Sequence, residues 1–262
     1  ANMTAEDLDM IIVATVTPDY ITQSTACLVQ NKLGVKQIPC FDVNAACSGF
    51  MYALTIAGSM VRGGVYKNIL VLGGEVLSRI VDMENRSNCI LFGDGAAAAI
   101  VSEVEDGYGM LSTHLGAEGE DDMILKIPAG GSKKPNDAET IANKENFLVM
   151  KGHDVFKFAV HALPLATNKA LKIANVKAEE LKMIFPHQAN VRIIESAAKR
   201  IHVPMEKFYL NLNKYGNTSA ASIGLALGEA KEKGLIQKGD LIALTGFGGG
   251  LTYGSIIMKW AY

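Results

Sequence analysis

The sequence predicts an α/β protein in which layers of helices cover mainly parallel sheets, and in which one structural unit occurs twice. Short apolar segments of strand length alternate with longer segments whose apolar residues recur at helical spacing. This alternation is typical of parallel sheets, which need helices on both faces. A similar stretch of sequence also occurs at the start of the chain and again in its second half. With 262 residues, 49% of them hydrophobic, the chain can bury a large core in one or two joined lobes.

The first half contains four expected strands and two expected helices. Apolar runs predict strands at 9–16, 40–46, 68–75 and 96–104. Helical spacing of apolar residues predicts helices at 24–34 and 48–64. Gly34 closes the first of these helices, because glycine readily adopts the left-handed conformation that ends many helices.

The second half continues the alternation and opens with a longer helix. Helical spacing extends over 154–175, where Pro164 is expected to introduce a kink. The remaining expected elements are a strand at 182–187, a helix at 191–201, a helix at 219–234 and a strand at 240–247.

Two matches indicate that the two halves are copies of one unit. Residues 1–11 (ANMTAEDLDMI) and 174–184 (ANVKAEELKMI) share seven of eleven residues at an offset of 173. In addition, the helix ending at Gly64 and its following strand resemble the helix ending at Gly234 and its following strand. This second offset, near 170, places Cys47 opposite Asn217. A duplicated α/β unit explains both matches, and we divide the chain into halves at 1–146 and 147–262.

The two predicted copies differ at their beginnings. A long helix precedes the strand at 182–187, whereas the chain begins where the matching helix of the first copy should already be ending. We therefore expect the first copy to be incomplete at its N-terminus, without a leading strand and helix.

Composition excludes several classes of function. A net charge of −2 gives no reason to expect nucleic acid as a partner. No apolar run approaches the roughly 20 residues of a membrane helix, and the first residues lack the pattern of a signal peptide. The four cysteines, at 27, 40, 47 and 89, form no CxxC pair and predict no metal site. Reduced thiols in a cytoplasmic protein are the expectation.

Cys47 is the candidate nucleophile. It lies in FDVNAACSGF, where an expected strand passes into a helix rich in small residues. The unpaired N–H groups at a helix start stabilise a thiolate, so we expect a lowered pKa for this thiol. Cys27, Cys40 and Cys89 are expected in the core. The alternative for Cys47, and the commoner one for a single cysteine, is also an inert buried thiol.

Two further residues and a glycine-rich turn complete the candidate site. His187 ends a strand in IFPHQAN, in the region where open parallel sheets bind ligands, although a structural histidine is the alternative. Asn217, in KYGNTSAAS, precedes a helix and could simply be its N-cap. The turn TGFGGGLTYG (245–254) lacks the Lys-Ser/Thr of a phosphate loop, but its N–H groups could face an oxyanion. The run FGDGAAAA (92–99) precedes a strand, which excludes a dinucleotide fingerprint.

Four segments, NAACSGF, PHQAN, YGNTSAAS and GFGGGLTYG, resemble in this order β-ketoacyl-acyl carrier protein synthase III. The resemblance extends from the first residue to the last. It implies the duplicated, layered α/β fold of thiolase-like enzymes, a homodimer, and neither metal nor bound organic cofactor. Members of the family usually have about fifty to sixty further N-terminal residues, which matches the deficit expected from the duplication.

The resemblance also assigns roles to residues. Cys47 is the acylated nucleophile, and His187 and Asn217 are hydrogen-bond donors. The N–H of Gly249 joins that of Cys47 in an oxyanion hole. The implied binding residues are Arg86 near the CoA adenine, then Gly152, Phe156, Ala189 and Asn190 along the entry tunnel, and Leu77, Phe92 and Phe247 near the acyl chain.

A cluster of basic residues is expected to receive the carrier protein. Arg192, Lys199 and Arg200 lie on the helix that follows His187, and Lys157 lies on the helix beside Phe156. Arg192 and Lys199 are seven residues apart and therefore share one helix face. The alternative is a solvated basic face without a partner.

The resemblance implies a decarboxylative condensation of an acyl-CoA, expected to be acetyl-CoA, with malonyl-acyl carrier protein. The alternatives are a related starter enzyme for polyketide or branched-chain synthesis, or a folded but inactive fragment. A 3-hydroxy-3-methylglutaryl-CoA synthase would need a glutamate base near Cys47, where Glu75 and Glu84 stand in no convincing motif. A papain-like peptidase shares the Cys, His, Asn order but needs a different motif around its cysteine.

Overall fold

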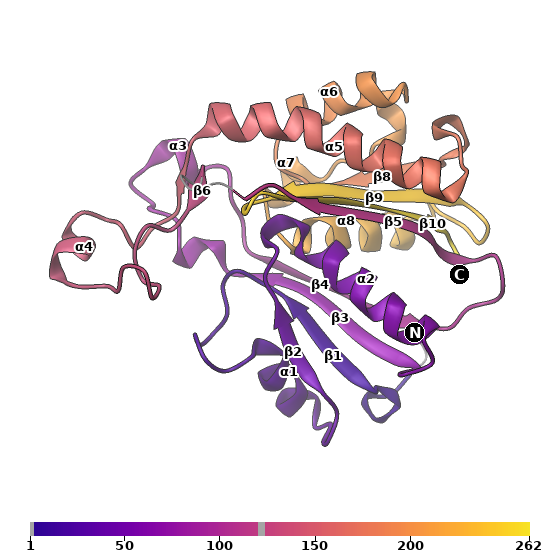
Figure 1. Cartoon of the computed structure of the whole chain (residues 1–262), viewed down its shortest axis with the longest axis horizontal. Helices are drawn as coiled ribbons and strands as arrows, with labels where there is room; N and C mark the ends of the chain where they lie inside the picture. The colour runs from indigo at the N-terminus through magenta and orange to yellow at the C-terminus, as the bar shows by residue number, and fades with distance from the viewer. Residues whose placement is uncertain (1–2, 120–123) are drawn as a thin grey trace.

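The protein is a stack of five layers in which helices and sheets alternate. The computed structural model describes residues 3–119 and 124–262. In Figure 1 the layers follow one another from α1, through the sheet of β1 to β4, the helices α2 and α8, and the sheet of β5 and β8 to β10, to α5 and α6. The layered α/β class predicted from the sequence is confirmed.

Each half of the chain supplies most of one four-stranded sheet. Sheet one has the order β2-β1-β3-β4 and comprises β1 (Met10–Ala14), β2 (Cys40–Val43), β3 (Asn68–Glu75) and β4 (Gly95–Ser102). Sheet two has the order β5-β10-β9-β8 and comprises β5 (Gly109–Ala117), β8 (Met183–Pro186), β9 (Leu241–Gly248) and β10 (Thr252–Lys259). Thus β5 lies before the division at 146/147 but pairs in sheet two. The division itself stays a prediction.

The expected mainly parallel sheets are mixed sheets. Strand β1 pairs in parallel with β2 and β3, and β8 pairs in parallel with β9. Strands β4 and β10, however, are antiparallel to the strands they follow, and β5 is antiparallel to β10. The link from β9 to β10 spans only residues 249–251, and a connection that short can join only antiparallel strands.

The strand pairings support the duplication. The parallel pair β1–β3 and the antiparallel pair β3–β4 correspond to β8–β9 and β9–β10. The short helices η1 (Ala5–Asp7) and η4 (Ala178–Glu180) are separated by the same 173 residues as the repeated sequence, whose residues 1 and 2 lie outside the described part. On the outer side of β10 lies β5, whereas no strand from the described residues lies on the outer side of β4.

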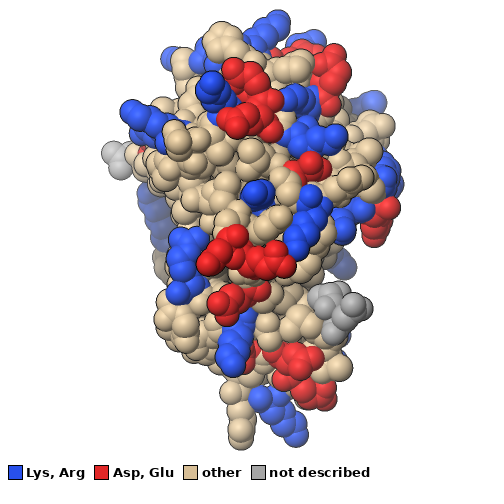
Figure 2. Space-filling view, turned by 90° about the vertical axis from the view of Figure 1, so that its right-hand side faces the viewer, with Lys and Arg blue, Asp and Glu red and all other residues tan. Residues whose placement is uncertain are grey.

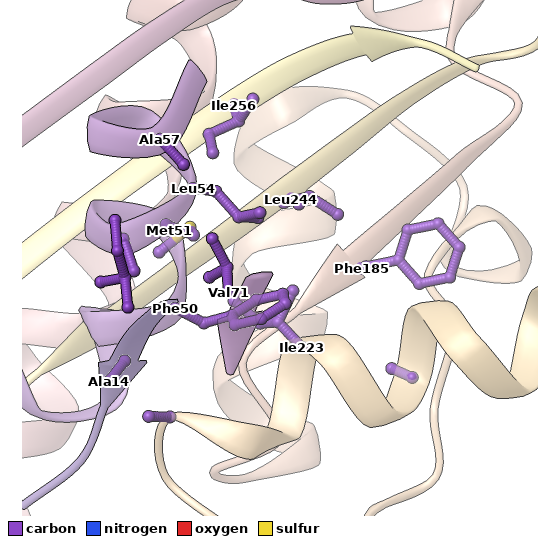
Figure 3. Close-up of a cluster of buried hydrophobic side chains, with 14 of the residues drawn as sticks. Ala14, Phe50, Met51, Leu54, Ala57, Val71, Phe185, Ile223, Leu244 and Ile256 are labelled. Carbon is purple, nitrogen blue, oxygen red and sulfur yellow. The ribbon is translucent and has the colours of Figure 1, made fainter. Parts of the chain in front are cut away.

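Two helices form the middle layer and share their apolar faces with both sheets. These are α2 (Gly49–Arg62) and α8 (Ala221–Glu232). Phe50 and Met51 of α2 are at most 1% exposed and belong to one core cluster with Leu244 and Ile256 of sheet two. Figure 3 shows these side chains with Val71 of sheet one and Ile223 of α8 around them.

The outer helices cover the remaining sheet faces. Helix α1 (Thr25–Leu33) packs on sheet one and ends at Gly34, whose φ of 75° is the left-handed cap expected from the sequence. Helices α5 (Gly152–Ala174) and α6 (Val191–Ile201) pack on sheet two through a second large cluster. Helix α5 continues past Pro164.

The short elements are α3 (Arg86–Cys89), α4 (Ala138–Ala142), α7 (Leu212–Tyr215), β6 (Leu125–Lys126), β7 (Val149–Met150), η2 (Ala46–Ser48), η3 (Leu77–Arg79) and η5 (Met205–Lys207).

The surface carries charges of both signs. Figure 2 shows Lys and Arg side chains interspersed with Asp and Glu over the face that it presents, as the net charge of −2 leads one to expect. Within residues 3–119 and 124–262, no helix combines the length and the apolar character needed to cross a lipid bilayer.

A close backbone contact joins sheet one to the start of α8, and it predicts a sharp difference between adjacent glycines. A Cβ at Gly73 would lie 2.5 Å from the carbonyl oxygen of Ala220, whereas a Cβ at Gly74 would meet an ordinary contact of 3.7 Å. We expect Gly73→Ala to lower the free energy of unfolding by about 1–3 kcal/mol, because backbone atoms cannot move aside cheaply. Gly74→Ala, the control, should change it much less in urea denaturation. Equal effects would contradict this close contact.

Candidate active site

Cys47 lies where the end of sheet one meets the end of sheet two. It is in η2, between β2 and α2, and its side chain is 8% exposed. Gly248, the last residue of β9, packs directly on it, since a Cβ at Gly248 would lie 2.6 Å from the Cys47 backbone nitrogen. The absence of a side chain at residue 248 therefore allows the two halves to meet at the nucleophile.

The resting thiol of Cys47 is protonated. Burial is the largest influence and raises its pKa to about 12; a hydrogen bond with Ser219 opposes the shift, and the Glu75 carboxylate adds to it. The expected lowering of the pKa by the helix start is therefore wrong, because burial outweighs it. Cys27, Cys40 and Cys89 are partly exposed rather than fully buried as expected, although Cys40 still packs against the apolar cluster of Ile11, Val13 and Ala26. All four thiols are free.

His187 follows β8 and is held as a neutral imidazole. Its N–H donates to the Thr245 carbonyl at 2.8 Å, which fixes the backbone against β9. The side chain is 1% exposed, and burial lowers its pKa to about 3. Nδ1 lies 2.7 Å from the Ser222 hydroxyl, and the Phe247 ring contacts the imidazole edge-on at 5.4 Å between centroids. At neutral pH the ring can therefore act as a donor or an acceptor without carrying charge.

Asn217 is held in a loop between α7 and α8 by hydrogen bonds to residues of the first half. Its N–H donates to the Leu91 carbonyl at 2.8 Å, and its carbonyl accepts from the Gly93 N–H at 2.9 Å. Its Oδ1 accepts from the Ser219 N–H at 2.9 Å. Asn217 does not cap α8, which begins at Ala221. Because Oδ1 is occupied, the side-chain amide nitrogen is the group that can donate to a ligand.

The start of α8 brings the three residues together. The Ser219 N–H donates to Asn217 Oδ1, and the next residue, Ala220, lies beside the start of α2, since a Cβ at Gly49 would be 3.7 Å from the Ala220 Cβ. Ser222, one turn further on, contacts His187. The last residues of β9 meet the same place, since Gly246 packs on the His187 Cβ and Gly248 on the Cys47 backbone. A thiol and two neutral polar groups, each belonging to a residue at most 8% exposed, are therefore gathered at the start of α8.

Gly249 lies beside the nucleophile, as its predicted role requires. It follows β9, and a Cβ at this residue would be 3.6 Å from the Cβ of Ala46, which precedes Cys47. Its part in an oxyanion hole stays a prediction.

The residues predicted near the acyl chain differ in what they contact. Phe92 forms a β-bridge with Asn217, and Phe247 contacts His187. Leu77, in η3, is 2% exposed. Two of the three therefore lie directly against catalytic candidates.

The residues predicted for CoA binding lie at the beginnings of helices. Arg86 is the first residue of α3 and Gly152 the first of α5, and both are exposed. Asn190 caps α6 by accepting from the Arg192 N–H at 2.9 Å, and Ala189 donates its N–H to the His187 carbonyl at 3.0 Å. Phe156 packs against the core cluster beneath α5. Ala189 and Asn190 thus follow His187 directly, and CoA binding by all five stays a prediction.

Three polar side chains of the site were not predicted from the sequence. Ser219 and Ser222 lie within the quoted YGNTSAAS segment, but nothing in that segment shows which of its hydroxyls meets Glu75 or His187. Glu75 was considered only as a base and set aside. It is 4% exposed and ends β3, and a buried carboxylate at the end of a strand is a signal that could have found it.

The described residues contain no group of three or more His, Cys, Asp or Glu side chains placed to hold a metal ion.

A buried cysteine at a helix start, beside a neutral histidine and an asparagine amide on a duplicated five-layer fold, defines a thiolase-like condensing enzyme. Comparison with known proteins narrows this class. A family model for 3-oxoacyl-[acyl-carrier-protein] synthase III matches residues 41–119, and the model for its C-terminal part matches residues 171–260.

Individual relatives agree with the family models. The β-ketoacyl-[acyl-carrier-protein] synthase III of Fusobacterium nucleatum is 69% identical over 262 residues, which are the whole of this chain and 80% of that protein. The crystal structure of 3-oxoacyl-[acyl-carrier-protein] synthase III from Aquifex aeolicus matches with a TM-score of 0.90 and 46% identity, over 99% of this chain and 80% of that one. The chain belongs to the β-ketoacyl-[acyl-carrier-protein] synthase III family.

A priming β-ketosynthase from a polyketide pathway is a more distant neighbour. It is 30% identical, with a TM-score of 0.88 over 98% of this chain and 75% of that one. The lower identity gives no support to the alternative of a polyketide starter enzyme.

Proposed function

We propose that Cys47, His187 and Asn217 carry out the reaction of this family. An acyl-CoA, acetyl-CoA in our proposal, condenses with malonyl-acyl carrier protein to give a 3-oxoacyl-acyl carrier protein, which initiates fatty-acid synthesis. The observation that supports this most directly is the meeting of a thiol, a neutral imidazole and an amide at the start of α8.

The first half-reaction transfers the acyl group to sulfur. Cys47 attacks the thioester carbonyl, and the N–H groups of Cys47 and Gly249 receive the developing negative charge on oxygen. Because the thiol is protonated at rest, its proton must leave as the new bond forms. Neutral His187 can take this proton and return it to the CoA thiolate, so that acyl-Cys47 and CoA–SH result. The Ser222 hydroxyl can donate to Nδ1 or accept from it, and so suits either tautomer.

The second half-reaction forms the carbon–carbon bond. The malonyl thioester loses CO2, and the electron pair left on carbon is shared with the thioester oxygen as an enolate. His187 Nε2–H and the Asn217 amide stabilise that oxygen. The carbon then attacks the acyl carbonyl on Cys47, and the sulfur leaves and regains a proton. This chemistry calls for no metal and no bound organic cofactor. The four free thiols suit the reducing conditions of the cytoplasm, where we propose that the protein acts.

The different roles proposed for these residues predict different effects on the two half-reactions. His187→Ala or Asn217→Ala should slow malonyl decarboxylation by about 10²–10³-fold, the usual cost of losing one donor to a developing oxyanion. Transfer of the acyl group from acetyl-CoA to Cys47 should be affected much less in Asn217→Ala. The measurements are release of labelled CO2 and mass spectrometry of the acylated protein. Loss of acylation with normal decarboxylation would contradict the assigned roles, and absence of acylation in the wild type would favour an inactive fragment.

We further propose that the four basic residues of α5 and α6 receive the acidic carrier protein. Lys157, Arg192, Lys199 and Arg200 are exposed. The Arg200 guanidinium lies 3.1 Å from Nδ1 of His161, one turn after Lys157, so that the cluster extends over both helices. Since α6 begins four residues after His187, its first turn lies close to the candidate site along the chain. Charges of this kind mainly raise the association rate.

Charge reversal at Arg192 tests this docking surface. Arg192→Glu should lower kcat/KM for the malonyl-carrier protein by roughly tenfold at low salt, and by less at high salt, because exposed charges are screened. Acylation by acetyl-CoA should change little. Lys231→Glu makes the same charge change on an exposed residue of the last turn of α8 and serves as the control. Equal losses in both variants, or none, would remove the basic cluster from the docking surface.

We also propose that the protein is a homodimer that pairs through β2. This strand is at the edge of sheet one, and no strand from the described residues lies on its outer side. An unpaired edge offers N–H and C=O groups to a second copy, and a symmetric pair is the commonest form of oligomer.

Light scattering should give about twice the chain mass of 28.0 kDa. A folded monomer at micromolar concentration would contradict the proposal.

A further inference from the structure

Glu75 is a buried carboxylate that joins the two halves of the chain, and the reaction described above gives it no role. It is the last residue of β3 and is 4% exposed. Its Oε2 accepts from three groups that follow β1, which are the Thr17 hydroxyl at 2.7 Å, the Val16 N–H at 3.1 Å and the Thr15 hydroxyl at 3.2 Å. Its Oε1 accepts from the Ser219 hydroxyl at 3.0 Å. Glu75 therefore ties the end of sheet one to the segment that leads into α8.

The surrounding hydrogen bonds make Glu75 the acceptor in these contacts. The Thr17 oxygen already accepts from the Val76 N–H at 2.9 Å, and the Thr15 oxygen accepts from the Thr17 N–H at 3.0 Å, so both hydroxyl protons can point at the carboxylate. A carboxylate has about four acceptor sites, and four donors meet it here. Burial raises the pKa of Glu75, and these hydrogen bonds oppose that shift. The ionised carboxylate holds Ser219 with a charge-assisted hydrogen bond.

Ser219 has a backbone conformation that serine seldom adopts. Its φ is 48°, in the left-handed region, where the Cβ crowds the following carbonyl oxygen. Its hydroxyl is bonded to Glu75, and its N–H donates to Asn217 Oδ1 at 2.9 Å. Because φ is the torsion about the bond between N and Cα, it sets the direction of this N–H relative to the side chain. The contact with Glu75 therefore supports the conformation that aims the N–H at Asn217.

The hydrogen bond from Ser219 decides which end of the Asn217 amide faces a ligand. A side-chain amide has a donor end and an acceptor end, and a half-turn about its last torsion exchanges them. The Ser219 N–H can only donate, so it retains Oδ1 and leaves Nδ2 for the enolate oxygen. Without it, the amide could turn its oxygen toward the enolate, and the two oxygens would repel each other. The bonds to Leu91 and Gly93 do not prevent this turn, because they hold only the Asn217 backbone.

We propose that Glu75 is a positioning residue for the condensation, which anchors Ser219 so that Ser219 presents the donor end of Asn217 to the substrate. This inference rests on the proposed function, in which the Asn217 amide stabilises the enolate oxygen. It gives Glu75 no contact with the substrate and no part in proton transfer. Loss of the anchor should therefore slow the malonyl half-reaction and affect acylation of Cys47 much less.

Removing the Ser219 hydroxyl tests the anchor. Ser219→Ala should slow malonyl decarboxylation about tenfold, which is less than the loss of the Asn217 amide, because the donor is misdirected rather than removed. In the Asn217→Ala background, Ser219→Ala should cause no further loss, since the effects of residues that act through one another do not add. A further tenfold loss in the double variant would overturn the proposal.

Ser24→Ala is the matched control for the loss of a serine hydroxyl from a carboxylate. Ser24 lies at the start of α1, and its hydroxyl donates to Asp42 at 2.7 Å. This variant should keep the wild-type rate of decarboxylation. An equal slowing in Ser24→Ala and Ser219→Ala would show a general loss of stability and would remove Glu75 from the positioning of Asn217.

Two other substitutions separate the anchor from packing and from charge. Ser219→Gly also lacks the hydroxyl, but glycine adopts a positive φ without strain, so it should recover much of the rate lost in Ser219→Ala. Glu75→Gln can direct its amide oxygen to the three donors after β1 and its NH2 group to the Ser219 oxygen, so it should lose less than Glu75→Ala. The proposal is wrong if glycine is no better than alanine at residue 219, and this result holds even if Glu75→Ala does not fold.

A measurement without substrate separates this inference from the proposed function. In a crystal structure of Ser219→Ala, φ at residue 219 should leave the left-handed region, and the 2.9 Å contact with Asn217 Oδ1 should be lost. The same φ and the same contact should remain in Ser24→Ala. An unchanged segment in Ser219→Ala would contradict the proposal even in a chain without activity. A changed segment in a chain whose wild type does not decarboxylate the malonyl thioester would instead support the anchor and refute the proposed function.

Discussion

The close packing of α2 and α8 between the two sheets is the constraint on which the rest of the structure depends. Each helix must contact sheets on two sides, and small residues make this possible. A Cβ at Gly49 would lie 3.0 Å from the Cβ of Ala14, and one at Gly224 would lie 2.6 Å from the Cβ of Ala97. Both helices start at the same end of the layer, where a Cβ at Gly49 would lie 3.7 Å from the Cβ of Ala220, so Cys47 and Asn217, which precede the two helices, are brought close together. The active site is thus a result of how the middle layer packs.

Much of this architecture could be predicted from the sequence, because apolar periodicity and the repeated segment are local properties. The strands β5 and β10, in contrast, could not be predicted from the sequence. The residues before β10 include Gly248, Gly249 and Gly250, whose composition indicates a turn, and β5 mixes polar and apolar residues without clear alternation. Both strands are antiparallel partners, so missing them also produced the expectation of mainly parallel sheets.

The three candidate catalytic residues were recognisable because each stands in its own short motif. Their supporting residues were not, because they depend on distances that only the fold determines. Ser222 is 35 residues from His187, and Glu75 is 144 residues from Ser219. The pKa of Cys47 was misjudged for the same reason: a helix start is visible in the sequence, whereas the exposed fraction of a thiol is not.

The pairing of β5 with β10 also bears on how the chain folds as it is synthesised. Ala117 at the end of β5 pairs with Thr252 at the start of β10, so β5 cannot pair until the much later segment β10 has left the ribosome. Until then, the β5 edge and the apolar face beneath α5 are without their final partners. Contacts so distant in sequence fold slowly and leave apolar surface exposed to aggregation. Chaperones that bind nascent chains should therefore matter more for this protein than for one whose neighbouring segments pair.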